Sequence, residues 1–149
     1  MKPSTPLPVL CACVLTCASI AAQAAGKCTI STSGLSFGTY DVFSSLSDDT
    51  TGTIIVNCHS GNSYTLSLSS GSGTYTSRAM KSGTHALAYN LFLDATRLTI
   101  WGDGSAGTGT VSGVGTGANI NTPVYGRIAA RQNAFVGTYS DVITVTITF

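Results

Sequence analysis

The C-terminal segment of this chain has its most regular strand pattern. From Ile143 to the end, ITVTITF, apolar residues and threonines alternate. Because successive side chains of a strand point to opposite faces of a sheet, this alternation predicts a strand with one apolar face and one threonine face. With Val142 included, the segment would span about 27 Å at ~3.4 Å per residue, which is enough to cross a sheet. The apolar face consists of Ile143, Val145, Ile147 and Phe149.

Short segments of similar character recur along the chain, separated by glycine and other turn-forming residues. None has helical periodicity, and even residues 86–94, ALAYNLFLD, place leucines and a tyrosine alternately on one face. The pattern predicts an all-β sandwich and excludes a parallel α/β sheet, which needs crossover helices. Residues 102–117 contain seven glycines and are predicted to be a flexible connection or an edge strand. The predicted strands are residues 28–33, 35–40, 52–58, 64–68, 75–80, 86–94, 98–101, 124–129 and 138–149.

The composition suits an extracellular β protein. Charged residues make up 9% of the sequence, against about a quarter in an average globular protein, and there is no glutamate. Seven basic and six acidic residues give a net charge of +1, with no basic run. We therefore expect neither nucleic acid nor an anionic membrane as a partner.

The N-terminal segment has the features of a secretory signal peptide. Lys2 precedes an apolar and small-residue run over residues 9–22, and a small-x-small cleavage pattern, AQA, ends at Ala24. We expect residues 1–24 to be a signal peptide, cleaved after Ala24 or the next alanine. The remaining residues, 25–149, have the length of one ordinary domain with one core.

Two alternatives would place the N-terminal segment in or on the membrane. An uncleaved anchor would need about 20 apolar residues to span a bilayer, which is more than the run provides. A lipoprotein would need a suitable small residue before Cys13 or Cys17, and Thr16 fits poorly before Cys17. We therefore expect secretion without stable membrane insertion.

The cysteines support the same compartment. Of the five cysteines in the sequence, three lie in the predicted signal peptide. The remaining two, Cys28 and Cys58, would meet an oxidising environment after export. We expect them to form a disulfide, which would close a loop of about 30 residues and contribute roughly 3 to 4 kcal/mol. Two free thiols are the alternative.

No catalytic, metal or cofactor site is predicted, and we do not expect an enzyme. GDGSAG, residues 102–107, matches a nucleotide-binding fingerprint, but no helix is predicted after it to bind a pyrophosphate. Cys58 is followed by a histidine, yet neighbours on a strand point to opposite faces. Asp48, Asp49 and Asp103 lack the ligand spacing of a calcium loop, and two histidines without a glutamate do not make a zinc set.

Aromatic residues leave one alternative function open. They could form a platform that stacks on sugar rings, although aromatic side chains within strand patterns normally fill a sandwich core. A self-sufficient, secreted carbohydrate-binding β-sandwich is therefore the alternative to the function implied below. The candidate aromatic residues are Tyr64, Tyr75, Tyr89, Trp101, Tyr125 and Tyr139.

An ordered set of segments resembles the spore coat protein U domain, which is the domain of archaic chaperone–usher pilus subunits and of related secreted coat proteins. The set covers nearly all of residues 25–149, and its order is more specific than any single piece. The segments are CTI (28–30), LSFGTYD (35–41), GTIIVNC (52–58), SRAM (77–80), LAYNLFLD (87–94), WGDG (101–104), VYGRI (124–128) and GTYSDVITVTITF (137–149).

The resemblance implies an immunoglobulin-like, pilin-type sandwich that lacks its last strand and leaves an open apolar groove. A periplasmic chaperone first fills this groove, and a strand from a neighbouring subunit replaces the chaperone at an outer-membrane usher. In this scheme the next strand comes from another molecule, and the four apolar residues from Ile143 to Phe149 line the groove. The implied function is structural, in a cell-surface fibre for adhesion and biofilm formation or in a spore coat.

Two details indicate a tip or capping subunit. After the expected cleavage, about three residues would precede Cys28, whereas a strand that fills such a groove needs roughly 10 residues. The chain would then accept a strand without donating one. Apolar loop residues could contact a surface at the tip, or alternatively close the ends of the core. These residues are Phe43, Leu46, Phe135 and Val136.

Overall fold

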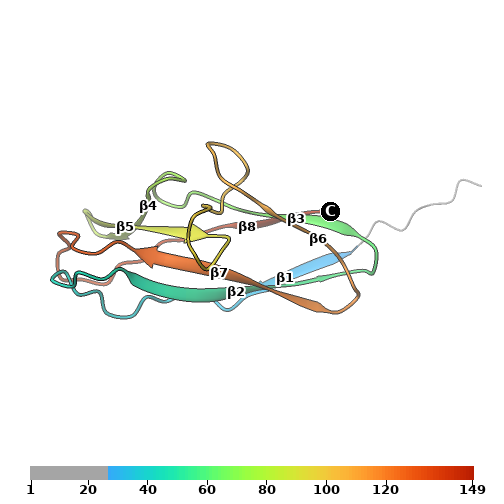
Figure 1. The fold of residues 1–149 in the computed structure, drawn as a ribbon, viewed down its shortest axis with the longest axis horizontal. Coiled ribbons are helices and arrows are strands. Elements are labelled where there is room, and N and C mark those ends of the chain that lie inside the picture. The colour runs from blue at the N-terminus through green and yellow to red at the C-terminus, as the bar shows by residue number, and fades with distance from the viewer. Residues whose placement is uncertain (1–26) are drawn as a thin grey trace, which may run out of the picture.

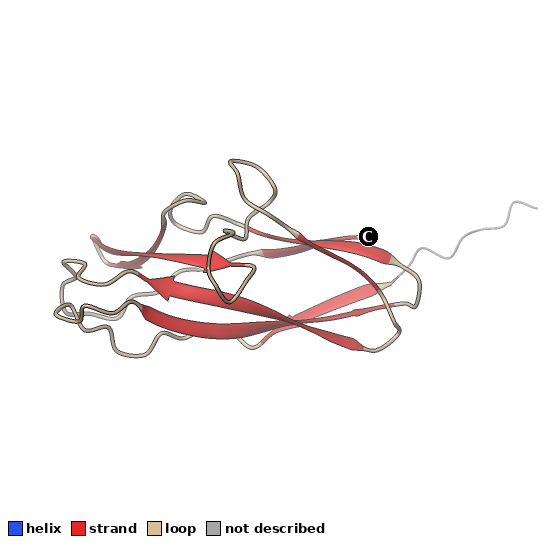
Figure 2. Cartoon of the chain, in the orientation of Figure 1, coloured by secondary structure: helices blue, strands red, loops and turns tan. Residues whose placement is uncertain are grey.

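Residues 27–149 are described by the computed structural model, and they form two antiparallel β-sheets (Figure 1). Within these residues there is no helix (Figure 2), so none is long and apolar enough to cross a membrane. The predicted signal peptide, residues 1–24, and the start of the predicted domain lie outside the described residues. The strands are β1 (Cys28–Thr32), β2 (Asp48–Cys58), β3 (Ser63–Leu68), β4 (Arg78–Ser82), β5 (His85–Phe92), β6 (Val111–Val114), β7 (Asn119–Ile128) and β8 (Val145–Thr148).

The strands are divided unequally between the sheets. One sheet has five strands in the order β1-β2-β7-β5-β4, and the other has three in the order β6-β3-β8. The longest ladder joins β2 to β7 and runs from Asp48 opposite Ile128 to Asn57 opposite Asn119. Among the described residues, β1 pairs only with β2, and β8 pairs only with β3. Both β1 and β8 are therefore edge strands.

Alternation along the strands determines which side chains lie between the sheets. In β2, every second residue from Gly52 to Cys58 is buried, and in β3 every second residue from Tyr64 to Leu68 is buried. Trp101 is also fully buried, and its indole Nε1 donates a hydrogen bond to the carbonyl of Leu66 at 3.3 Å. The prediction of an all-β sandwich is confirmed.

Two of the predicted strands do not form. Residues 35–40 belong to no ladder, because Gly34 and Gly38 adopt φ angles of 72° and 73° that turn the chain away from the direction of β1. Residues 98–101 take part only in isolated bridges. Conversely, the glycine-rich segment contains an edge strand, β6, which was one of its two predicted forms.

The predicted strand over residues 138–149 is shorter than expected. Ser140 exchanges two backbone hydrogen bonds with Lys81 of β4, at 2.8 and 3.1 Å. The chain is thus attached to the edge of the five-stranded sheet before it crosses to the three-stranded sheet, where β8 begins at Val145. This crossing joins the two layers at one side of the sandwich.

Arg78, the first residue of β4, is fully buried. Its guanidinium donates hydrogen bonds to the carbonyl oxygens of Ser69 and Trp101, at 2.8 and 2.7 Å, and to Oδ1 of Asn90 at 2.7 Å. It also lies 5.7 Å from the ring centroid of Tyr75. Burial lowers the pKa of this guanidinium, but arginine remains protonated in proteins, so these partners replace the water that the charge has lost. The network connects segments that are distant in the sequence.

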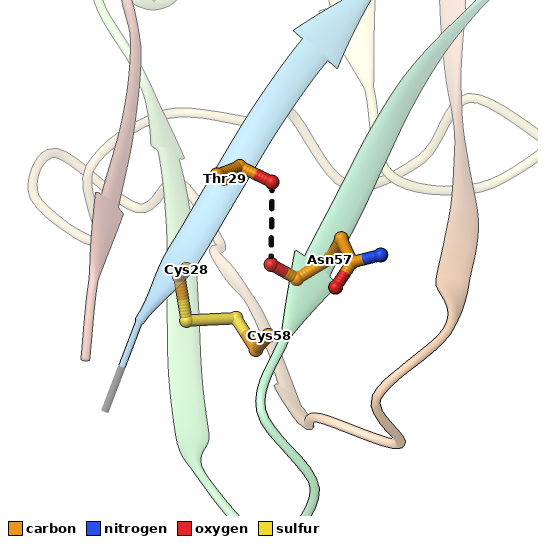
Figure 3. Close-up of a disulfide and its surroundings, with 4 residues drawn as sticks. All are labelled: Cys28, Thr29, Asn57 and Cys58. Carbon is orange, nitrogen blue, oxygen red and sulfur yellow. Dashed lines mark hydrogen bonds between the residues drawn. A yellow bond between two sulfur atoms is a disulfide. The ribbon is translucent and has the colours of Figure 1, made fainter. Parts of the chain in front are cut away.

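Cys28 and Cys58 form a disulfide at the end of the ladder between β1 and β2, with their Cα atoms 4.1 Å apart (Figure 3). Beside it, the Thr29 hydroxyl donates a hydrogen bond to the carbonyl of Asn57 at 3.5 Å. The bridge therefore fixes the position of the edge strand β1 covalently.

Replacing both cysteines by serine is expected to lower the free energy of unfolding by roughly 3 to 4 kcal/mol, because the unfolded chain regains the entropy of the open loop. Urea unfolding of the exported protein measures this change. A reductant should lower the stability of the unmodified protein in the same way and leave the double variant unaffected. An unchanged unfolding midpoint in the double variant would contradict the expectation.

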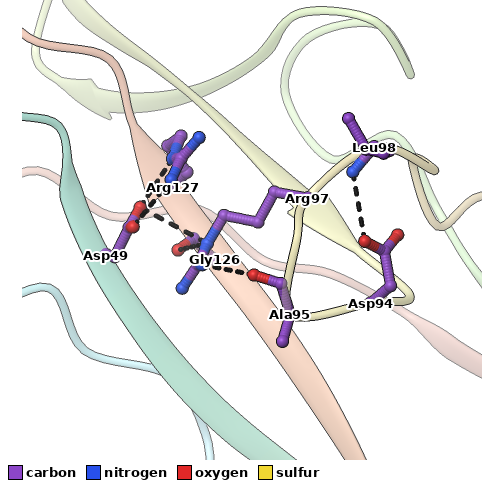
Figure 4. Close-up of polar contacts among 7 residues, drawn as sticks. All are labelled: Asp49, Asp94, Ala95, Arg97, Leu98, Gly126 and Arg127. Atoms are coloured by element: carbon purple, nitrogen blue, oxygen red, sulfur yellow. Dashed lines mark hydrogen bonds and ion pairs between the residues drawn. The ribbon is translucent and has the colours of Figure 1, made fainter.

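An ion-pair cluster holds the loop after β5 on the five-stranded sheet (Figure 4). Arg127 donates two hydrogen bonds to the Asp49 carboxylate, at 2.7 and 2.8 Å, and Nε of Arg97 lies 3.3 Å from the same carboxylate. In the same loop, Asp94 accepts a hydrogen bond from the backbone N–H of Leu98 at 3.3 Å. The cluster joins this loop to β2 and β7 by side-chain contacts.

The cluster predicts a dependence of stability on pH. The hydrogen bond from Arg127 holds the pKa of Asp49 below its usual value. Such a carboxylate contributes stability above its unfolded-state pKa, and the contribution is lost as the pH falls through the lowered folded-state pKa. Asp49→Asn is expected to lower the free energy of unfolding by about 0.5 to 1 kcal/mol at neutral pH, because the pair is partly exposed. In strong acid the variant and the unmodified protein should unfold alike, and a difference that persists there would refute this assignment.

Candidate functional site

A cleft of about 290 Å³ lies between the two sheets, beside the edge of β8. Its floor is the inner face of β2, β7 and β5, and its walls are the segment after β1 and the chain that leads into β8. Most of the lining is apolar. Apolar residues include Ile54, Leu91 and Val124 on the floor and Leu35, Phe37 and Ile143 on the walls.

The first wall, residues 33–40, packs against Gly52 of β2 and Gly126 of β7. A Cβ atom at Gly126 would lie 2.8 Å from the ring of Phe37 and 3.1 Å from the side chain of Leu35. A Cβ atom at Gly52 would lie 2.7 Å from the carbonyl oxygen of Gly34. These two glycines of β7 and β2 therefore let the wall approach the sheet closely.

The second wall has an open backbone edge. The backbone N–H of Ser69 donates a hydrogen bond to the carbonyl of Thr144 at 3.0 Å, so the threonines of this strand direct their backbone groups toward β3. Hydrogen-bonding directions alternate along an antiparallel strand, so Val145 and Ile147 direct their backbone groups to the other edge. No strand of the described chain pairs with that edge. Their half-buried side chains point inward, and their backbone groups are available for a further strand.

One end of the cleft is polar. Asp141, Ser140 and Tyr89 line it together. The Tyr89 hydroxyl donates a hydrogen bond to Oδ2 of Asp141 at 2.7 Å, and the backbone N–H of Ser72 donates to Oδ1 at 3.0 Å. Burial, and then this bond to Asp141, raises the pKa of Tyr89, so the phenol stays protonated. Asp141 thereby connects β5 and the loop after β3 to the chain before β8.

The four predicted groove residues lie at different depths. Ile143 and Val145 line the cleft. Ile147 is half-buried against the core, while Phe149 is 60% exposed. The deep part of the cleft therefore lies beside the start of β8 and the chain before it.

Of the residues that line the cleft, sequence reasoning predicted Ile143 and Val145 only. It missed the rest, among them Leu35, Phe37, Tyr89 and Asp141. The spacing of Leu35 and Phe37 between two glycines was a usable signal for an extended apolar segment. Nothing in the sequence indicates that Asp141 hydrogen-bonds Tyr89, because the two residues lie 52 positions apart.

The predicted surface-contact residues lie on the loop before β2 and the loop after β7, which are at the same end of the sandwich because Asp48 pairs with Ile128. This end is the one farther from the start of β1 (Figure 1). The Tyr40 hydroxyl joins the loops, because it donates to the carbonyl of Ala129 and accepts from the backbone N–H of Gln132, both at 2.8 Å. Phe135 stacks on His85 with ring centroids 4.1 Å apart. Exposed fractions are 89% for Phe43, 77% for Leu46, 59% for Phe135 and 107% for Val136.

Several side chains that the sequence suggested for metal, nucleotide or sugar binding have structural roles instead. Within residues 27–149 there is no group of three or more histidine, cysteine, aspartate or glutamate residues that could hold a metal ion. GDGSAG forms a turn, in which Asp103 accepts hydrogen bonds from the backbone and hydroxyl of Ser105. Trp101, Tyr64 and Tyr89 are buried, so their ring faces are not available to stack on a sugar.

The fold is similar to a solved structure of known class. It matches, with a TM-score of 0.62 and 23% sequence identity, a chain in the crystal structure of a chaperone–tip adhesion subunit pre-assembly complex from archaic chaperone–usher Csu pili of Acinetobacter baumannii. The match covers 84% of this chain and 40% of that chain, so this protein spans less than half of its length. Two unequal antiparallel sheets with an open edge beside an apolar cleft place the protein in the pilin-type class of β-sandwiches.

Sequence comparison identifies the family. The Spore Coat Protein U domain family profile matches residues 14–146. The chain is also 35% identical over 148 residues to Protein U of Myxococcus xanthus, covering 86% of this chain and 80% of that protein. The chain belongs to the Spore Coat Protein U domain family, which confirms the predicted resemblance.

Proposed function

We propose that this protein is a non-enzymatic structural subunit of a cell-surface fibre or spore coat, and that its cleft takes a β-strand from another polypeptide. The observation that carries the proposal is the open edge of β8, where Val145 presents an inward apolar side chain and outward backbone groups beside the cleft. The family assignment and the pilin-type fold agree with a structural role.

The physical basis of the proposed contact is β-augmentation, in which an extended segment adds one strand to a sheet edge. Backbone hydrogen bonds supply affinity, and alternate side chains supply register by entering the cleft. Each aliphatic side chain that becomes fully buried contributes about 1.5 to 3 kcal/mol. An unfilled apolar edge would favour aggregation, so the strand would be needed from the time of export.

The proposed partners act in sequence. The protein would be exported through the periplasm, where a chaperone supplies the first strand, and a neighbouring subunit would replace this strand at an outer-membrane usher. The structural similarity to a chaperone–subunit complex of Csu pili supports a chaperone as the first partner. The final location would be the cell surface.

A tip or capping position is part of the proposal. After cleavage behind Ala24, too few residues would precede Cys28 to fill a cleft in another subunit. N-terminal sequencing of the exported protein tests this point. A mature N-terminus near Pro8 would leave a long arm and remove the argument for a cap.

Co-expression with a periplasmic pilus chaperone tests the proposed function. We expect a one-to-one complex that co-purifies from the periplasm, and a lower soluble yield when the chaperone is absent, because part of the protein then aggregates or is degraded. Val145→Pro tests the open edge of β8. It removes one backbone donor from this edge and should weaken the complex. A stable, soluble monomer that ignores the chaperone would contradict the proposal.

Surface attachment through the exposed loops is a separate expectation. Replacing Phe43 and Phe135 by serine should lower binding to an apolar surface severalfold without reducing secretion, because both rings are largely exposed. Attachment of the exported protein to polystyrene beads measures the effect. Leu98→Ser is a matched control, since Leu98 is 83% exposed on a different loop. Unchanged attachment, or loss of secretion, would count against an adhesive role.

A further inference from the structure

The polar end of the cleft has hydrogen-bonding capacity that the described part of the chain does not use. Oδ1 of Asp141 accepts hydrogen bonds from the Ser72 backbone N–H at 3.0 Å, the Ser72 hydroxyl at 2.8 Å and the Val142 backbone N–H at 2.9 Å. Among residues 27–149, Oδ2 accepts one bond, from the Tyr89 hydroxyl at 2.7 Å. A carboxylate offers about four acceptor positions over its two oxygens, so Oδ2 can take a further donor. The Tyr89 oxygen also keeps an acceptor lone pair.

These groups lie where an added strand would end its inward row of side chains. Asp141 is on the same face of the chain as Ile143 and Val145, since the three residues alternate, and all three line the cleft. In a strand paired with the open edge of β8, the residue that faces Asp141 lies next to the residues that face Ile143 and Val145. This neighbourhood is the same for either direction of the strand.

The polar end of the cleft favours some side chains of the added strand over others. An apolar side chain over Asp141 would take the remaining acceptor position of Oδ2 out of water and supply no further donor, which is costly. A hydroxyl or amide group would donate a hydrogen bond to Oδ2 instead.

We infer that Asp141 sets the register of the strand that fills the cleft. The partner is an extended segment whose alternate residues are apolar where they face Val145 and Ile143, and carry a hydroxyl or amide where they face Asp141. The inference rests on the proposed function, because it requires a strand in the cleft.

A fused strand tests the register. The full chain is extended after Phe149 by an Asn-Gly turn and an alternating strand long enough to run back along β8 to Asp141, since a two-residue turn of this kind fixes the pairing of a hairpin. The first fusion carries serine opposite Asp141 and leucine opposite Ile143. The second fusion exchanges these two residues, so both fusions have the same composition and length.

The first fusion is expected to have a folding equilibrium constant about tenfold or more above that of the second, measured by denaturant unfolding of the exported proteins, because a hydrogen bond to a charged group is strong. With Asp141→Ala the difference in stability between the two fusions should become smaller. Only the difference between leucine opposite Ile143 and leucine opposite residue 141 should then remain. With Tyr89→Phe, which keeps the ring on the floor of the cleft, the preference for serine opposite Asp141 should persist or increase, because Oδ2 loses the one donor that it has among the described residues.

The possible results distinguish a failure of the inferred role of Asp141 from a failure of the proposed function. Equal stability of the two fusions, both above the unextended protein, would overturn the role of Asp141 and leave the proposed function standing. Two fusions that are no more stable than the unextended protein would overturn both. A serine preference that is unchanged by Asp141→Ala would also refute the inference, because a general loss of stability in that variant acts on both fusions alike.

Discussion

Arg78→Ala is expected to be among the most destabilising single substitutions in the protein, with a loss on the order of 5 kcal/mol in the free energy of unfolding. The substitution removes the guanidinium donor from the carbonyls of Ser69 and Trp101. Oδ1 of Asn90 also loses this donor and keeps the backbone N–H of Leu91. A buried acceptor that loses its partner costs about 1 to 3 kcal/mol, and the vacated volume adds a cavity cost. Denaturant unfolding of the exported protein measures the effect.

Two further variants identify the cause of this loss. Arg78→Met keeps most of the side-chain volume but provides no donor, so it should recover only the part of the loss that comes from the cavity. Lys81→Ala removes an exposed charge from the same strand and should change stability by less than about 0.5 kcal/mol. If Arg78→Met were as stable as the unmodified protein, hydrogen bonding by Arg78 would not be what stabilises this part of the fold.

The inward face of β8 could be predicted from the sequence, whereas the burial of Arg78 could not. The inward face of β8 follows from alternation alone, since a strand has only two faces. The burial of Arg78 does not follow from any local pattern, because its acceptors come from residues 69, 90 and 101, which only the finished fold brings together. An arginine in a short strand is most often exposed.

Of the two walls of the cleft, one was predicted from the sequence and the other was not. The apolar row at Ile143 and Val145 was predicted, and the structure adds the opposite wall at Leu35 and Phe37. That wall depends on the absence of side chains at Gly126, on a strand about 90 positions further along the chain. Long-range packing of this kind cannot be deduced from the spacing of residues in one segment.

The open edge of β8 leads to the second large expected effect. An alternating apolar strand fused after Phe149 through an Asn-Gly turn should raise the free energy of unfolding by an amount on the order of 5 kcal/mol, because three inward side chains would be buried at about 1.5 to 3 kcal/mol each. These side chains would lie opposite Ile147, Val145 and Ile143. Fusion also makes the added strand intramolecular, which lowers the entropic cost of ordering it.

A matched fusion with serine at the three inward positions and unchanged outward residues separates side-chain burial from backbone pairing. It should recover little of the gain, because serine supplies backbone hydrogen bonds to β8 without apolar burial. The fused apolar strand should also remove the need for a chaperone during export, since the edge it covers is the one that would otherwise aggregate. Equal stability of the apolar and serine fusions would mean that the cleft does not take up side chains, and the proposed role of the cleft would then be wrong.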